Sequence, residues 1–128
     1  LTNSLASTEV TAVHAGYKKY RKGLLQTGLK LFELKPSARP SLLKVKAFFN
    51  RFGSVSLHAK YMVLDQRYVF IGSANLDPRS ENLNTEIGIM VDSEELAKQT
   101  RKLFERATSA ENCYQLSLDK KKGNIIWQ

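Results

Sequence analysis

The stretch spanning residues 58–86, HAKYMVLDQRYVFIGSANLDPRSENLNTE, restricts the fold of this chain more than any other part of the sequence. Residues 55–64 alternate in the manner of a strand and end at a short Asp-Gln-Arg run that suits a turn. Residues 68–71 are rich in β-forming side chains, and residues 86–91 have the pattern of another strand. The stretch therefore predicts two adjacent strands, a turn and a third strand.

The polar residues of this stretch have the types that phosphoryl transfer requires. Residues two apart on a strand point to the same face, so His58 and Lys60 project together. The turn after the second strand brings Ser73 and Asn75 towards them, next to small residues that let the backbone approach a ligand closely. A histidine can attack phosphorus, a lysine and an asparagine can hold its oxygens, and a carboxylate such as Glu86 can fix the imidazole tautomer.

Four other polar residues have weaker claims on the site. Asp65 lies an odd number of positions from His58, so we interpret it as a turn residue that pairs with backbone or a cation. His14 either lines the rim of the site or packs beside Tyr17, and we favour packing and give it no catalytic role. Arg79 and Asn82 follow the stretch closely, and they either line the pocket or are solvated turn residues.

The first part of the chain predicts an α/β unit. Residues 1–5 are a short strand candidate, and residues 9–27 repeat apolar side chains at intervals of three and four, with basic side chains mostly off that stripe. Gly28 suits the end of this helix, and residues 29–34 alternate as a strand does. Residues 41–52 either form a basic amphipathic segment on a membrane surface or pack as a loop under the domain, and we favour the loop.

The last part of the chain predicts a helix and a hairpin. Asp92 followed by Glu95 resembles a capping box, which would begin a helix extending to about residue 107. Residues 114–118 and 124–127 flank a turn-like basic cluster and would form the hairpin. We interpret the lysines of that cluster as a solvated turn rather than a binding site.

Composition limits the possible classes of binding partner but does not select one of them. The chain has 128 residues, which suits one domain, and its formal net charge of +8 with a pI of about 9.7 implies an anionic partner. Nucleic acid, acidic lipid headgroups and phosphorylated substrates all fit. A lone Cys113 excludes an intrachain disulfide, and we expect a packed thiol there rather than a nucleophile. The chain lacks an initial Met, so we expect it to be part of a longer protein.

Two motifs identify a family resemblance. HAKYMVLD fits the pattern HxKxxxxD and is followed by GSAN, which resembles the HKD motif of the phospholipase D superfamily, with Glu86 as the later family glutamate. The segments LTNSLASTEV, VHAGYKKYRKGLLQTG and FIGSANLDPRSENLNTE resemble the C-terminal half of bacterial cardiolipin synthase-like proteins. The resemblance covers most of the chain, from Leu1 to about Trp127.

The resemblance implies a fold and a mechanism. The fold would be an α/β domain over residues 1–128, with a mixed β-sheet, helices on both faces and one HKD lobe. His58 would be a catalytic histidine of a ping-pong transfer that passes through a phosphohistidine. Lys60 and Asn75 would bind the phosphate oxygens, Ser73 would add a phosphate or histidine contact, and Glu86 would orient His58. No metal or other cofactor would be needed, because the lysine and asparagine side chains stabilise the charge of the transition state.

The chain contains one HKD motif, whereas the implied chemistry uses two. The second motif would come from another lobe of the same parent protein, as in a two-lobed cardiolipin synthase, or from a homodimer partner. The substrate would be an anionic phospholipid such as phosphatidylglycerol, handled in the bacterial cytoplasm at the inner membrane. The expected function is that of a phosphatidyltransferase or phospholipase D. The alternative is a nuclease or phosphodiesterase of the same superfamily that acts on nucleic acid as a homodimer.

Overall fold

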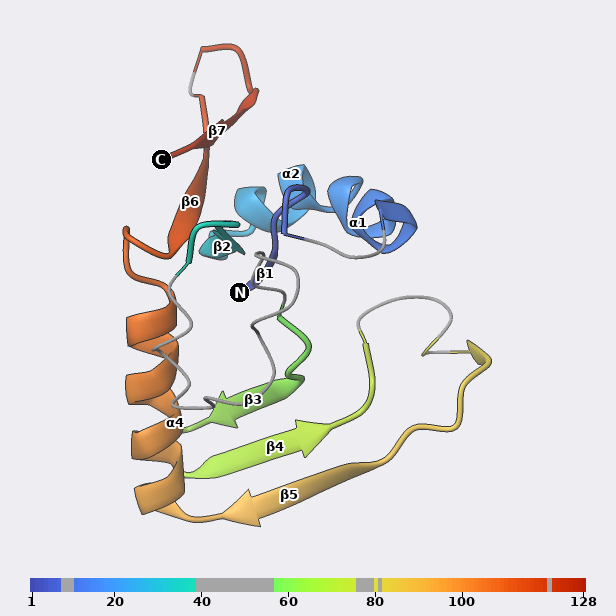
Figure 1. The fold of residues 1–128 in the computed structure, drawn as a ribbon, viewed down its shortest axis with the longest axis vertical. Helices are drawn as coiled ribbons and strands as arrows, with labels where there is room; N and C mark the ends of the chain where they lie inside the picture. Colours follow the sequence, from blue (N-terminus) through green and yellow to red (C-terminus); the bar gives the residue numbers. More distant parts are fainter. Residues whose placement is uncertain (8–10, 39–56, 76–79, 81, 120) are drawn as a thin grey trace. The chain divides into compact units, whose positions relative to one another are not determined.

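The computed structural model describes residues 1–7, 11–38, 57–75, 80, 82–119 and 121–128 (Figure 1). The chain divides into two compact units, one made of residues 1–57 with 106–128 and the other of residues 58–105. The α/β class is confirmed, and the described strands belong to two separate sheets. The interpretations of residues 41–52 and of Arg79 lie outside the described residues.

The first unit contains a four-stranded mixed sheet in the order β1-β2-β6-β7. Its strands are β1 (Thr2–Asn3), β2 (Leu31–Leu34), β6 (Cys113–Leu118) and β7 (Ile125–Trp127). β1 is parallel to β2, and the other two pairs are antiparallel, so the expected hairpin at the end of the chain is confirmed. Its core is formed by Leu34, Ala38 and Cys113, which confirms that the thiol is packed.

The helical pattern of residues 9–27 forms two helices instead of the single one expected. These are α1 (Thr11–Lys18) and α2 (Arg21–Gln26), and the turn between them has a tight hydrogen bond from Tyr20 N to Tyr17 O of 3.0 Å. After this turn Arg21 points inward, where its Nη1 donates to Glu33 Oε1 at 2.8 Å. The sequence placed this arginine among basic side chains mostly off the apolar stripe, whereas the structure buries it. Gly28 follows α2 with a φ of 87°, a conformation that suits glycine, so the expected end of the helix is confirmed.

The second unit contains a three-stranded antiparallel sheet in the order β3-β4-β5 (Figure 1). The strands are β3 (Tyr61–Leu64), β4 (Tyr68–Gly72) and β5 (Gly88–Asp92), which confirms the strand, turn and strand order expected from the sequence. Helix α4 (Glu94–Ala107) follows β5 directly.

The cap of α4 corrects the capping box expected at Asp92. Ser93 Oγ accepts a hydrogen bond from Leu96 N at 3.2 Å, which makes Ser93 the N-cap. Asp92 instead remains in β5 and pairs with Arg67 through two hydrogen bonds of 2.6 and 2.8 Å. Asp92 is the last residue of β5 and pairs with Tyr68 of β4, so the helix begins after it, with Ser93 as the N-cap.

Candidate active site

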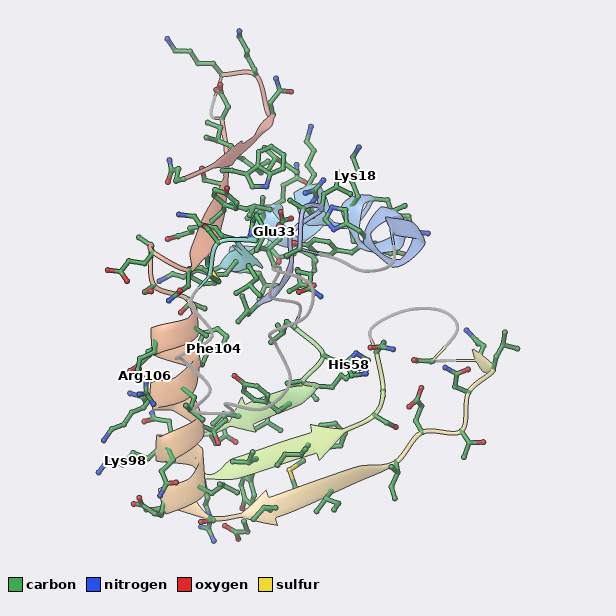
Figure 2. All side chains as sticks on the ribbon, viewed as in Figure 1. Lys18, Glu33, His58, Lys98, Phe104 and Arg106 are labelled. Atoms are coloured by element: carbon green, nitrogen blue, oxygen red, sulfur yellow. The ribbon has the colours of Figure 1, made fainter. Side chains whose placement is uncertain are left out.

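The expected site residues gather at one end of the β3-β4-β5 sheet. β3 begins there, β4 ends there and β5 begins there. Gly72 N donates to Lys60 O at 3.0 Å and Ser73 N donates to Ile87 O at 2.9 Å, so the strand pairing continues past the strand ends. Figure 2 shows His58 at this end of the sheet. The antiparallel order thus places residues from three separate segments beside one another.

A pair of glycines and an aromatic ring pack against each other at this end of the sheet. Gly72 is paired with Gly88 across β4 and β5. A Cβ added at Gly72 would lie 2.9 Å from the ring of Phe70 and 3.0 Å from Ile87 O, and a Cβ added at Gly88 would overlap the same ring. The ring therefore occupies the space that two side chains would otherwise need, and the strands can pair closely up to the site.

His58 and Lys60 form the first half of the site. Lys60 Nζ lies 3.0 Å from His58 Nε2, as expected for two side chains that project together. An ammonium group has hydrogens to donate and no lone pair, so the imidazole nitrogen accepts. This contact corresponds to the tautomer that has the imidazole hydrogen on Nδ1. His58 is exposed and Lys60 half-buried, so a substrate can reach both.

Ser73 and Glu86 form the second half. Ser73 Oγ donates to Glu86 Oε2 at 2.5 Å and accepts from Ile87 N at 3.0 Å. Asn84 Nδ2 donates to the other carboxylate oxygen at 3.3 Å. Hydrogen bonds from Ser73, then Ser80 and Asn84, together with the charge of Lys60, lower the pKa of the Glu86 carboxyl below its ordinary value. The carboxylate is therefore ionised throughout the neutral range.

The structure brings these two halves to one end of the sheet without a hydrogen bond between His58 and Glu86. Among the described residues, Glu86 forms hydrogen bonds with Ser73, Ser80 and Asn84. His58 forms one with Lys60. Asn75 has an exposed side chain, and its backbone N donates to Ser80 Oγ at 3.1 Å. The roles expected for Glu86 and Asn75 stay predictions.

Two residues of this network were missed in the sequence. Ser80 is 7% exposed, and its hydroxyl links the Asn75 backbone to the Glu86 carboxylate. Asn84 bonds to the same carboxylate. Asn84 could have been found, because it stands two positions before Glu86 and so can share a face with it. Ser80 carried no such signal, since the sequence between it and Asn75 reads only as a turn.

Asp65 and His14 belong to other elements, a turn of the second unit and helix α1 of the first. Asp65 stands at the other end of β3, in the turn to β4, where it and Gln66 have φ values of 49° and 57°. Arg67 N donates to Leu64 O at 3.0 Å and closes this two-residue turn. His14 belongs to the first unit, is 6% exposed and contacts the Tyr17 ring edge-on at 5.7 Å between centroids, which confirms the packing interpretation. Asn82 is exposed.

Comparison with known proteins decides the family. Residues 1–108 match the family described as cardiolipin synthase, PLD-like domain. The chain belongs to this family. Over 127 residues it is 45% identical to cardiolipin synthase C of Escherichia coli, a match that covers 99% of this chain and 26% of that protein. No solved structure matches the chain significantly.

Two further relatives are more distant. An uncharacterized protein of Helicobacter pylori is 36% identical over 107 residues, which cover 79% of this chain and 19% of that protein. Cardiolipin synthase 1 of Staphylococcus epidermidis is 42% identical over 50 residues, which cover 39% of this chain and 10% of that protein. This PLD-like domain thus spans about a quarter or less of the length of these relatives.

In the part of the chain that the structure describes, no cluster of three or more His, Cys, Asp or Glu side chains could hold a metal ion. Over the same residues, no helix has the length and apolar character needed to cross a bilayer.

Proposed function

We propose that this PLD-like domain supplies one of two catalytic histidines for phosphodiester transfer on glycerophospholipids, in a cardiolipin synthase-like phosphatidyltransferase or phospholipase D. The observation that carries the proposal is the 3.0 Å contact from Lys60 Nζ to His58 Nε2. It places the nitrogen that would attack phosphorus beside a cation that can bind a phosphate oxygen. A phosphate oxygen that takes the place of Nε2 on the lysine would free the lone pair of Nε2 for attack. Membership of the cardiolipin synthase family supports a phospholipid as the substrate.

The reaction would proceed in two displacements. In the first, a histidine Nε2 attacks phosphorus, an N–P bond forms, and the P–O bond to the leaving alcohol breaks while the other histidine protonates that oxygen. In the second, that other histidine takes the proton of an acceptor hydroxyl, whose oxygen attacks phosphorus and breaks the N–P bond. A lipid hydroxyl as acceptor gives transfer, and water gives hydrolysis. His58 can take either histidine role.

The remaining site residues would position the phosphate and the imidazole. Lys60 and Asn75 would hold the non-bridging oxygens and stabilise the negative charge that develops on them. Ser73 would keep Glu86 in place, through the 2.5 Å hydrogen bond to its carboxylate. Glu86, kept ionised by its donors, would accept the Nδ1 hydrogen of an imidazole once the two halves of the site close on a substrate.

The second HKD motif would come from another lobe of the parent protein or from a second copy of this domain. Because the domain spans 26% of cardiolipin synthase C, the rest of such a protein has room for another lobe. The donor lipid would be anionic, such as phosphatidylglycerol, and the site would work at the cytoplasmic face of the bacterial inner membrane.

The decisive experiment uses the full-length protein with phosphatidylglycerol vesicles labelled in the headgroup phosphate, in the presence of EDTA. We expect lipid turnover and an acid-labile, alkali-stable phosphorylated protein, as a phosphohistidine would give. His58→Ala should lower turnover by at least about 10²-fold, the typical contribution of a positioned acid, base or nucleophile. Asp65→Asn is the matched control and should keep turnover.

The same preparation is assayed with single- and double-stranded DNA. Cleavage of DNA without turnover of lipid would replace the proposed function with the nuclease alternative. Full lipid turnover by the His58→Ala variant would show that this site is not the catalytic one.

A further inference from the structure

The helical segment of residues 11–30 carries positive charge without any acidic residue. Of its basic side chains, Arg21 is buried against Glu33, while Lys18, Lys19, Lys22 and Lys30 are exposed. Figure 2 shows Lys18 extending outward from α1. The exposed lysines therefore form a surface whose charge is not balanced by acids of the same segment.

The end of the Lys22 side chain reaches towards the tip of the β6-β7 hairpin. A Cβ added at Gly123 would lie 3.4 Å from Lys22 Nζ, although the two residues are distant in sequence. Lys121 and Lys122 of the tip are exposed, and their backbone N atoms donate to Asp119 Oδ1 at 2.7 and 3.1 Å. The nearby aspartate thus fixes the turn, and the lysine side chains extend outward from it.

Two exposed apolar side chains stand next to lysines of this segment. Tyr20 and Leu29 are each 54% exposed and stand directly beside Lys19 and Lys30 in the sequence. Lys19 Nζ lies 4.8 Å from the centre of the Tyr20 ring. Aromatic and aliphatic side chains flanked by lysines suit the boundary between lipid headgroups and acyl chains. An exposed leucine would contribute nothing to the binding of nucleic-acid phosphates, because its side chain has neither charge nor a hydrogen-bond donor.

We infer that this basic surface, made of Lys18, Lys19, Lys22, Lys121 and Lys122 with Tyr20 and Leu29, docks the domain on an anionic lipid bilayer. The inference rests on the proposed function for its lipid substrate and adds the face by which the protein meets the membrane. The lysines attract the headgroups, and the two apolar side chains enter the interface. Lys121 and Lys122 then belong to a binding surface, contrary to our interpretation from the sequence.

The test measures cosedimentation of the full-length protein with phosphatidylcholine vesicles, with and without phosphatidylglycerol. The test variant is Lys22→Gln/Lys121→Gln/Lys122→Gln, and the control is Lys98→Gln/Arg101→Gln/Lys102→Gln on α4, which removes the same charge from the other unit. A lysine near an anionic surface contributes about fivefold in affinity, so the test variant should bind the anionic vesicles at least about tenfold more weakly. The control should change binding less than about twofold. Equal losses in the two variants, or no loss in either, would overturn the inference.

A second variant separates lipid from nucleic acid. Tyr20→Ser/Leu29→Ser should weaken vesicle binding and leave binding of a single-stranded oligonucleotide unchanged. If the lysine variant lost the oligonucleotide but kept the vesicles, the surface would be a nucleic-acid site and the inference would be wrong.

Turnover separates this inference from the proposed function. His58→Ala should still sediment with vesicles, and the lysine variant should still turn over phosphatidylglycerol dispersed in detergent. If His58→Ala kept its turnover, the proposed function would fail, while the vesicle measurements would still decide the docking surface.

Discussion

At the scale of single residues, Asp65 lies in the turn after β3, and we expect it to take no part in the chemistry. Its φ of 49° lies in the left-handed region, which asparagine tolerates and β-branched residues do not. We expect Asp65→Asn to leave the free energy of unfolding and the turnover nearly unchanged. Asp65→Val should lower the unfolding free energy by about 1–2 kcal/mol. Urea unfolding and lipid turnover of both variants check this, and a large loss of turnover in Asp65→Asn at unchanged stability would assign the aspartate a catalytic role.

Ser80 affects the site through its hydrogen bonds with Asn75 and Glu86. Its hydroxyl accepts from Asn75 N and bonds to Glu86, whose pKa it helps to lower. Ser80→Ala removes a donor from the carboxylate, so the pKa of Glu86 should rise towards its ordinary value. Because activity would need the ionised carboxylate, the acidic limb of the rate profile should move to higher pH.

The measurement is turnover across the acidic pH range. Ser80→Thr is the conservative variant, and it should return the acidic limb of the rate profile to its wild-type pH. Ser93→Ala removes the N-cap serine of α4, which typically lowers stability by about 1 kcal/mol, and it should leave the limb in place. A limb that shifts equally in Ser80→Ala and Ser93→Ala would mean that stability alone moves it.

At the scale of elements, the pairing of β4 with β5 depends on two glycines under one ring. Gly88→Ala would drive a Cβ into Phe70, and overpacking of this kind costs about 1–3 kcal/mol. We expect urea unfolding to show this loss of stability. Turnover should also be weaker, because Glu86 stands two residues before Gly88, where β5 begins. Gly16→Ala in α1 is the matched control, since its Cβ would meet nothing within 4 Å and an alanine favours a helix. Equal stability of Gly88→Ala and wild type would show that the ring moves aside freely.

The elements of the first unit are joined by a buried ion pair. Arg21 on α2 bonds to Glu33 on β2, and Trp127 Nε1 on β7 donates to the other Glu33 oxygen at 2.9 Å. Arg21→Met leaves that carboxylate buried without its cation, which should lower the unfolding free energy by about 3–5 kcal/mol. Arg21→Met/Glu33→Leu should recover much of the loss. Chemical denaturation followed by tryptophan fluorescence measures both, and a double variant as unstable as the single one would contradict this account.

At the scale of the whole molecule, the chain contains two histidines, and the one that is not in the HKD motif is buried beside Tyr17 in the other unit. We therefore expect the isolated 128-residue chain to turn over lipid at least about 10²-fold more slowly than the full-length protein, because one of the two proton-transferring or nucleophilic groups is missing. Gel filtration run alongside the assay determines whether the chain is a monomer. Turnover by a dimer would instead support pairing of two copies.

Much of the architecture could be predicted from the sequence because its causes are local. The alternation in β3, the β-formers of β4 and the Asp-Gln turn act over a few residues. The spacing of His58 and Lys60 on one face follows from the two-residue period of a strand. The types of the site residues, the family resemblance and the hairpin at the end of the chain came from the same short-range patterns.

The tertiary structure alone decided what depends on contacts between distant residues. It buried Arg21 against Glu33, split one helical pattern in two, and made Ser93 the N-cap of α4 while Asp92 pairs with Arg67. It also brought Ser80 to Asn75 and Glu86. The two ion pairs join residues that lie far apart along the chain. The helix break, the cap and the Ser80 contacts are closed by single hydrogen bonds that no period of the sequence records.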